Sequence, residues 1–242
     1  MLKNYIAVIG QGAVSYQDAL AALCGGVLLL PPADGMDPRV ASHPDMLMMT
    51  IGQDVVVPAS YAARADVQPI LDKMCHACGI RVIITERSPG AVYPADAVCN
   101  GLLFGGYLYG KRTALAPEIL RLAANYGMDA VDARQGYAGC SALACEDLLI
   151  TADPSIRKAV TDRGGEVMFL TPGGIDLPGY DTGFIGGAGG YVNRHAVFFG
   201  DLGRHPDGER ILQTLGERDI ICHALADGPL TDFGGIKFFS IK

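Results

Sequence analysis

The sequence predicts an α/β protein in which five similar units close into a ring. Three observations support this prediction. Short apolar runs typical of strands alternate with stretches of helical spacing along the whole chain. An opening turn that carries an aspartate or a cysteine recurs every 41 to 55 residues, counted through the joined chain ends. Strand-like segments at the two ends complete one unit between them, which leaves no unpaired sheet edge.

Each unit is expected to contain two strands, a helix and a closing strand (ββαβ). The first unit opens at 43–45 and continues with strands at 46–51 and 55–57, a helix at 66–78 and a strand at 81–85. The second opens at 93–96, with strands at 101–104 and 107–109 and a helix at 116–126. An ordinary α/β alternation without a ring is the alternative, and the regular spacing favours the ring.

The third and fourth units repeat this order. The third opens at 136–140, with strands at 141–144, 148–151 and 166–170. Its helix begins at Asp153-Pro154, an acidic cap followed by proline in the first turn. The fourth opens at 179–181, with strands at 183–192, 196–199 and 220–224 and a helix at 208–216.

The fifth unit is divided between the chain ends. Its opening turn and first strand are expected at 231–232 and 236–241, and the rest at 5–9, 16–23 and 27–30, where 16–23 is helical. We therefore expect residues 1–242 to form a single domain.

Composition limits the function classes. Half of the 242 residues are apolar and 19% are charged, which predicts a well-buried core. The net charge is −7 and no basic cluster exceeds Lys111-Arg112, so nucleic acid is not an expected partner. The apolar stretch 19–33 contains paired glycines and prolines and is too short for a membrane span. Seven scattered cysteines and no signal-peptide pattern indicate the cytoplasm.

Several stretches resemble the penteins, the fivefold ββαβ propellers of the guanidino-group-modifying enzyme (GME) superfamily. The matching stretches are 43–47 (HPDML), 136–141 (GYAGCS), 150–153 (ITAD), 177–181 (LPGYD) and 183–187 (GFIGG). Within the superfamily, the chain resembles the uncharacterised bacterial subgroup recorded as a GME-fold domain of unknown function. The resemblance extends over essentially the whole chain.

The resemblance implies a pseudo-fivefold α/β-propeller whose opening loops converge on a central cavity. In the enzymes of this superfamily, a cysteine nucleophile, a histidine and two carboxylates act there on arginine-like substrates. Members that resemble translation initiation factor 6 have the fold without the chemistry. Two hypotheses follow: a cysteine-dependent hydrolase or transferase for a small guanidino compound, or a non-catalytic protein that binds a small cation or a protein partner. Neither requires a metal or an organic cofactor.

Four opening turns carry an aspartate suited to such a ligand. A guanidinium is flat and cationic, and a carboxylate binds it through charge-assisted hydrogen bonds. An aspartate in a turn also commonly accepts hydrogen bonds from its own backbone, so each one has a structural alternative. We expect at least two of the four to line the site: Asp45, Asp96, Asp181 and Asp232.

Cys140 is the one opening position where cysteine replaces aspartate, and it is expected at the start of a strand. As a nucleophile, its thiolate would attack the guanidinium carbon and give a covalent thiouronium after an amine leaves. The alternative is a small buried cysteine with no chemical role.

His43 precedes Asp45 by two residues, and this arrangement resembles the histidine and substrate carboxylate of arginine deiminases. The histidine would protonate the leaving nitrogen and then deprotonate water. The alternative is a loop histidine that packs against Pro44. In the known enzymes the cysteine follows in the last repeat, whereas here Asp232 occupies that repeat. A closed ring nevertheless brings non-adjacent units together. His205-Pro206-Asp207, a second copy, is typical of a helix start.

Two other patterns are interpreted as structural, and a third is left open. Cys75 and Cys78 end a helix, where the dipole disfavours thiolates, and a single pair is a weak zinc signal. The partial dinucleotide motif at 10–12 lacks its third glycine. The glycine-rich stretch 183–190 suits either close approach of the backbone to a ligand or tight packing between units near the ring axis.

Overall fold

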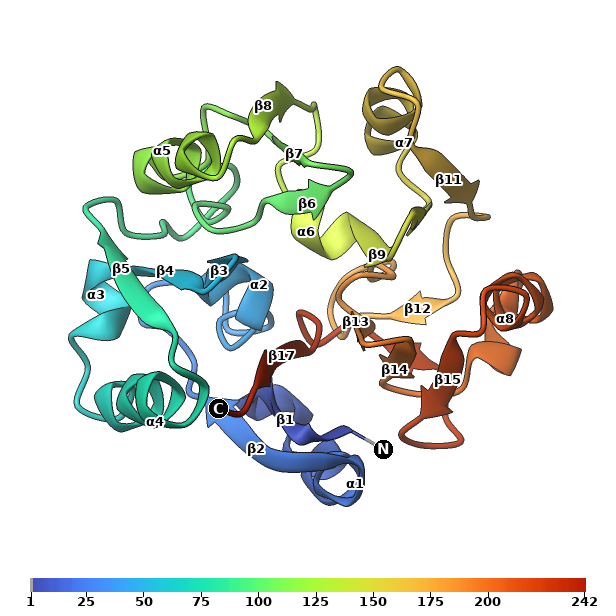
Figure 1. Cartoon of the computed structure of the whole chain (residues 1–242), viewed down its shortest axis with the longest axis horizontal. Helices are drawn as coiled ribbons and strands as arrows, with labels where there is room; N and C mark the ends of the chain where they lie inside the picture. The colour runs from blue at the N-terminus through green and yellow to red at the C-terminus, as the bar shows by residue number, and fades with distance from the viewer. Residues whose placement is uncertain (1) are drawn as a thin grey trace.

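The computed structural model describes residues 2–242 and has a mixed α/β fold. Over these residues it contains five three-stranded sheets and one two-stranded sheet. In Figure 1 the three-stranded sheets lie around a common centre, and each presents one short strand towards that centre. The longer helices lie on the outer rim: α1 (Gln17–Leu23), α4 (Gln68–Cys78), α5 (Pro117–Asn125), α7 (Pro154–Thr161) and α8 (Gly208–Gly216).

Four of the three-stranded sheets are built from consecutive strands. These strands are β3 (Met49–Ile51), β4 (Asp54–Pro58), β5 (Arg81–Thr85), β6 (Leu102–Phe104), β7 (Tyr107–Gly110), β8 (Asp129–Asp132), β9 (Ala142–Cys145), β10 (Leu148–Thr151), β11 (Glu166–Phe169), β13 (Gly189–Val192), β14 (His195–Phe198) and β15 (Ile221–Ala224). Within each sheet the first two strands pair antiparallel and the third pairs parallel to the second. A helix precedes every parallel strand, because a parallel connection needs a crossover.

The fifth three-stranded sheet joins the two ends of the described chain. Its order is β17 (Lys237–Ser240), β1 (Leu2–Gly10) and β2 (Cys24–Leu30). Strand β17 pairs antiparallel with β1, with Tyr5 opposite Ser240, and β2 pairs parallel with β1. Figure 1 shows both chain ends beside this sheet. The predicted division of one unit between the ends of the chain therefore matches the strand pairing.

The middle strand of each sheet is buried on both faces, which explains its continuous apolar sequence. In β4, Val55 and Val57 pack into a cluster shared with β1 and β2, whereas Val56 packs into a cluster shared with β7. In β10, Leu149 packs with β7, and its neighbours on both sides pack with β14. A last cluster joins β1 to β14 through Ile9 and Val197. Each cluster thus joins two neighbouring sheets.

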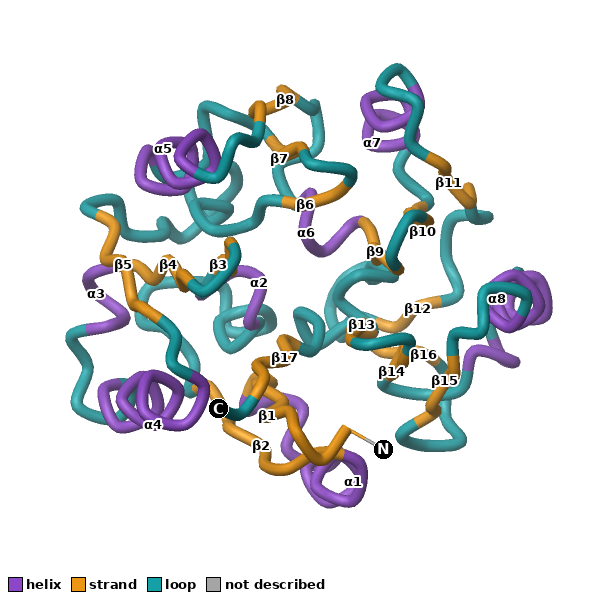
Figure 2. Tube along the Cα trace, in the orientation of Figure 1, coloured by secondary structure: helices purple, strands orange, loops and turns teal. Residues whose placement is uncertain are grey.

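The predicted elements agree with the structure except near the centre. The strand predicted at 46–51 is wrong in its first part, because Pro44–Leu47 forms helix α2 and only Met49–Ile51 pairs as β3. Helix α8 has the predicted bounds and follows Asp207, as the second His-Pro-Asp motif indicated. The strand predicted at 183–192 is wrong in its first part, because only Gly189–Val192 pairs as β13. Figure 2 shows the preceding segment as a loop. Cys140 lies in a one-turn helix, α6 (Ala138–Ser141), and not at the start of a strand.

The remaining elements are short: α2 (Pro44–Leu47), α3 (Ala59–Ala62), the 3₁₀ turns η1 (Gln11–Tyr16) and η2 (Leu202–Arg204), and strands β12 (Ile175–Asp176) and β16 (Leu230–Thr231). Within residues 2–242, no helix has the length and apolar character that crossing a membrane demands.

Candidate functional site

Cys140 is held by the side chain of Asn100, which lies just before β6. The Asn100 Oδ1 atom accepts hydrogen bonds from the backbone N–H groups of Gly139 (2.7 Å) and Cys140 (3.1 Å). Its Nδ2 atom donates to the Cys140 Sγ atom at 2.9 Å. Both side chains are buried. Asn100 carries no functional signal in the sequence, because an asparagine before a glycine is typical of an ordinary turn.

Helix α6 is stabilised locally and by a tight contact. The Ser141 hydroxyl and backbone N–H both donate to the Tyr137 carbonyl, which closes the turn around Cys140. A Cβ atom at Gly139 would lie only 2.9 Å from the Gly101 carbonyl oxygen and 3.0 Å from Asn100 Oδ1. Glycine is therefore required at position 139, because any side chain would push α6 away from Asn100.

His43 and Asp232 lie next to each other, with 3.7 Å between His43 Nδ1 and Asp232 Oδ1. The Asp232 carboxylate accepts hydrogen bonds from the backbone N–H groups of Gly234 and Phe184, both at 2.9 Å. Gly234 has φ = +79°, and a Cβ atom there would collide with the His43 Cβ atom. Its lack of a side chain lets the last unit approach the first.

Cys140 shares one cavity of about 170 Å³ with His43 and Asp232. The other lining residues are Val40, Met46, Tyr137, Leu177, Tyr180, Thr182 and Phe184. Residues from units that are not adjacent in sequence therefore meet at one place. The nucleophile and acid/base predicted from the sequence border the same space, together with one of the four predicted aspartates.

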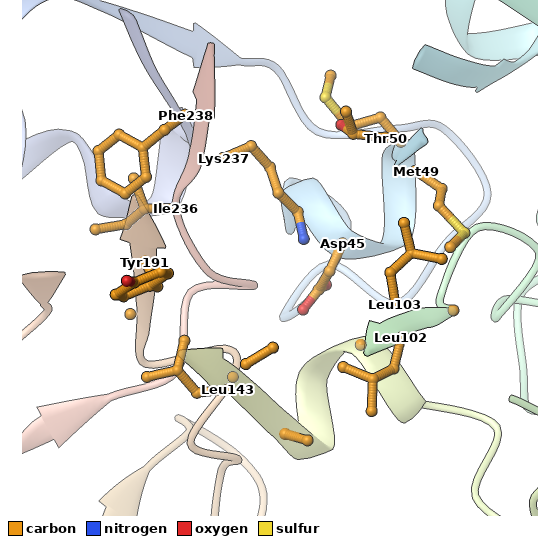
Figure 3. A pocket seen from close by; sticks show the side chains of 18 of the residues that line it. Asp45, Met49, Thr50, Leu102, Leu103, Leu143, Tyr191, Ile236, Lys237 and Phe238 are labelled. Atoms are coloured by element: carbon orange, nitrogen blue, oxygen red, sulfur yellow. The ribbon is translucent and has the colours of Figure 1, made fainter. Parts of the chain in front are cut away.

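Asp45 adjoins the Cys140 thiol but lines a second cavity of about 230 Å³. Figure 3 shows this cavity, with the Lys237 side chain directed towards the Asp45 carboxylate. Asp45 is 2% exposed, and within residues 2–242 neither of its carboxylate oxygens has a hydrogen-bond partner of normal geometry. Such a buried, unpaired carboxylate is costly unless a ligand or proton compensates it.

Asp96 and Asp181 differ in position. Asp96 is buried, and its Oδ2 atom accepts a hydrogen bond of 2.7 Å from the Tyr137 hydroxyl. It therefore reaches the first cavity through Tyr137. Asp181 is exposed and does not line either cavity within the described part of the chain.

Burial dominates the electrostatics of these side chains. It lowers the pKa of His43 to about 4, so the imidazole is neutral at pH 7. Burial raises the pKa of Asp45 to about 6, and burial together with the charge of Asp45 raises that of Asp232 to about 7. Burial and the two carboxylates also hold the pKa of the Cys140 thiol well above its usual range, against the opposing hydrogen bond from Asn100. A bound cation would favour the charged form of all three acids.

The patterns interpreted as structural have packing roles. Cys78 is buried in the cluster between β2 and β4, and Cys75 packs against it. Among residues 2–242, no group of three or more His, Cys, Asp and Glu side chains is arranged to hold a metal ion. In the glycine-rich stretch, the Gly187 N–H donates to the Cys140 carbonyl at 3.1 Å, and a Cβ atom at Gly186 would lie 2.6 Å from that same oxygen.

Comparison with protein families gives one assignment: the family described as "Family of unknown function (DUF6873)" matches residues 10–237. The chain belongs to the DUF6873 family. A comparison of this DUF6873 sequence with curated proteins finds no match.

Solved structures of guanidino-group enzymes share the fold of this DUF6873 chain. Dimethylarginine dimethylaminohydrolase from Pseudomonas aeruginosa, complexed with citrulline, matches with a TM-score of 0.55 and 11% identity over 94% of this chain and 93% of the enzyme. An amidinotransferase of saxitoxin biosynthesis from Microseira wollei gives 0.53 and 9%, over 93% and 91%. Inosamine-phosphate amidinotransferase from Streptomyces griseus gives 0.52 and 13%, over 95% and 80%. These neighbours belong to the pentein superfamily, which the sequence motifs resembled.

Proposed function

We propose that this protein is a cysteine-dependent hydrolase or transferase that acts on a small guanidino or amidino compound. The observation that carries the proposal is the shared cavity, where a buried thiol, a neutral histidine and an acidic side chain meet. The general kind of reaction is supported by the fold neighbours, which are a guanidino-group hydrolase and two amidinotransferases.

The fold part of the proposal is a pseudo-fivefold propeller of ββαβ units, formed by residues 1–242 as one domain. It is supported by the apolar clusters, each of which packs between two neighbouring sheets, including the sheet that contains both chain ends. A reducing compartment such as the cytoplasm fits the seven cysteines, all of which are free thiols.

In this proposal Asp232 binds the cationic guanidinium in the cavity with Cys140, and Asp45, which adjoins the same thiol from the other cavity, adds negative charge beside it. Both carboxyls have raised pKa values without a ligand, so a bound cation draws them into their ionised forms. The same positive charge lowers the pKa of the Cys140 thiol. The nucleophile is therefore activated only when the ligand is present, because the empty site disfavours the thiolate.

The proposed reaction begins when neutral His43 accepts the thiol proton and the Cys140 Sγ atom bonds to the guanidinium carbon. The imidazolium is stabilised by the nearby Asp232 carboxylate. It then donates its proton to the departing amine, whose C–N bond breaks to leave a thiouronium. His43 next deprotonates a water molecule, whose oxygen attacks the same carbon. The C–S bond then breaks, and the imidazolium returns its proton to the Cys140 thiolate. The hydroxyl proton of the adduct is released and is taken up by the departed amine. The products are a urea and an ammonium ion. In a transferase, an acceptor amine replaces water.

The test is a panel of guanidino and amidino compounds incubated with the wild-type protein and with Cys140→Ala. Released ammonia or amine, the urea product and a covalent adduct are measured by mass spectrometry. Cys145→Ala is the matched control, because Cys145 is also a buried free thiol but lines neither the cavity with His43 nor the cavity with Asp45. We expect turnover in the wild-type and control proteins and none in Cys140→Ala. Turnover that survives in Cys140→Ala would refute the mechanism.

The second candidate is a non-catalytic protein that binds a small cation or a protein partner. The raised thiol pKa of Cys140 and its hydrogen bonds with Asn100 favour a structural role for this residue. Ligand binding that is unchanged in Cys140→Ser, no turnover across the panel, and no alkylation of Cys140 by iodoacetamide would establish this candidate over the enzyme.

A further inference from the structure

The cavity that contains Cys140 has a largely apolar wall and one acidic side chain, Asp232. Val40, Met46, Leu177 and Phe184 form the apolar part of this wall. Tyr137, Tyr180 and Thr182 complete it, and their hydroxyl groups already donate to protein oxygens. His43 and Asp232 lie beside the thiol. Resting on the proposed function, we infer that the ligand is a guanidine or amidine with a compact apolar body and no carboxylate. The site thus selects against amino-acid guanidines such as arginine.

Within residues 2–242, the lining of this cavity offers no free cation to a ligand carboxylate. In the described part of the chain, no lysine or arginine lines this cavity. Lys237 lies in the other cavity, beside Asp45. A carboxylate placed within hydrogen-bonding reach of Asp232 would also meet a like charge, which is unfavourable in a buried site.

An arginine that contacts a residue of the cavity wall is already paired. Arg39 stacks over the ring of Tyr180, with 4.2 Å between its guanidinium carbon and the ring centroid. Its Nε and Nη2 atoms donate to Asp37, and its Nη1 atom donates to the Gly179 carbonyl at 2.7 Å. The Tyr180 hydroxyl donates to the same aspartate. Arg39 therefore braces the wall from outside and is not free to bind a ligand anion.

The volume of the cavity also limits the size of the ligand. The cavity volume of about 170 Å³ is close to the roughly 150 Å³ of an engineered apolar cavity that binds benzene. After the guanidinium occupies the acidic end, the remaining space suits a short alkyl chain or one ring. The apolar side chains that face this space favour a body without polar groups, because a buried polar group without a partner is destabilising.

The experiment compares ligand pairs that differ in one terminal group. Propylguanidine is paired with 3-guanidinopropanoate, and phenylguanidine with 4-guanidinobenzoate. Binding to Cys140→Ser is measured by calorimetry, so that turnover does not enter the comparison. We expect the carboxylate-free member of each pair to bind at least tenfold more tightly. Equal or tighter binding of the carboxylate-bearing member would overturn the inference.

A cation introduced into the wall should remove this selectivity. We expect Val40→Arg to shrink the affinity ratio within each pair at least tenfold, because the new guanidinium can pair with the ligand carboxylate. Leu212→Arg is the matched control, since Leu212 is exposed on α8 and does not line this cavity. The ratio is measured on one protein, so partial unfolding affects both ligands equally. An unchanged ratio in Val40→Arg would count against the inference.

The outcomes separate the inference from the proposed function. Selective binding of the carboxylate-free compounds without any turnover by the wild-type protein would support the inference and refute catalysis. Turnover by the wild-type protein that prefers carboxylate-bearing compounds would support catalysis and overturn the inference. If neither member of either pair binds, both the inference and the guanidine class of ligand are overturned.

Discussion

Substitution of Asn100 by alanine should destabilise the protein more than any surface asparagine substitution. The change removes the only hydrogen-bond acceptor shown for the Gly139 and Cys140 N–H groups within residues 2–242. The Cys140 N–H is buried, so leaving it unpaired costs about 1–3 kcal/mol. The half-buried Gly139 N–H adds about 1 kcal/mol. Together these losses predict a decrease of about 2–4 kcal/mol in the free energy of unfolding.

The assay is chemical unfolding followed by far-UV circular dichroism, because the chain has no tryptophan. Asn125→Ala is the control: Asn125 is exposed at the end of α5, and its removal should change stability by less than about 0.5 kcal/mol. A loss below about 1 kcal/mol in Asn100→Ala would show that the hydrogen bonds from α6 to Asn100 do not stabilise the fold. One unpaired buried N–H group alone should cost more than that.

Three further predictions concern pH, backbone conformation and a buried acid. Because the pKa of Asp232 is raised to about 7, the folded protein binds more protons than the unfolded chain between about pH 4 and 7, and this contribution to stability is lost as pH rises. The stability of Asp232→Asn relative to the wild type should therefore increase across that range by up to about 4 kcal/mol, and a flat difference in unfolding free energy would contradict this. Gly234→Ala should lower the melting temperature more than Gly127→Ala. Both positions have positive φ, but only a side chain at position 234 would meet another side chain, that of His43. Equal decreases in melting temperature would be inconsistent with close packing at Gly234. Tyr137→Phe should lower the free energy of unfolding by about 1–3 kcal/mol, because it removes the hydroxyl that donates to the buried Asp96 carboxylate. Tyr93→Phe is the control in the same unfolding assay. Its ring is half-exposed, so the change should cost less than about 0.5 kcal/mol.

The fold was accessible from the sequence because the middle strands are buried on both faces. A run such as Val55–Val57 contributes to two apolar clusters, so it is continuously apolar and easy to recognise. The helices were recognisable for a local reason. Asp153 caps α7 by accepting hydrogen bonds from two backbone N–H groups, and Pro154 fits the first turn.

The errors arose near the centre, where packing overrides local pattern. The segment 183–188 has glycines and apolar residues suited to a strand, yet it packs against α6 and donates hydrogen bonds to Asp232 and Cys140. The first strand of the fourth unit therefore begins only at Gly189. Several residues separate this strand from the opening turn at 179–181. This displacement accounts for the exposed position of Asp181, although its motif resembles that of the buried Asp96.

Parts of the candidate site were predictable and parts were not. His43, Cys140 and Asp232 were identified because each occupies an opening turn, and those turns converge. Asn100 and Lys237 carry no comparable local signal. Their contributions depend on long-range contacts, with Asn100 holding a helix 40 residues away and Lys237 facing Asp45 from the opposite end of the chain.

The sheet formed by β17, β1 and β2 has a consequence for biosynthesis. Strand β1 leaves the ribosome long before its antiparallel partner at Lys237–Ser240, because more than two hundred residues lie between them. Until then one edge of β1 remains unpaired, and such an edge can associate with other chains. The large sequence separation also slows closure, because the entropy of a long loop must be overcome before that pairing forms. Newly made chains should therefore depend on chaperones most strongly until Lys237–Ser240 is available to pair with β1.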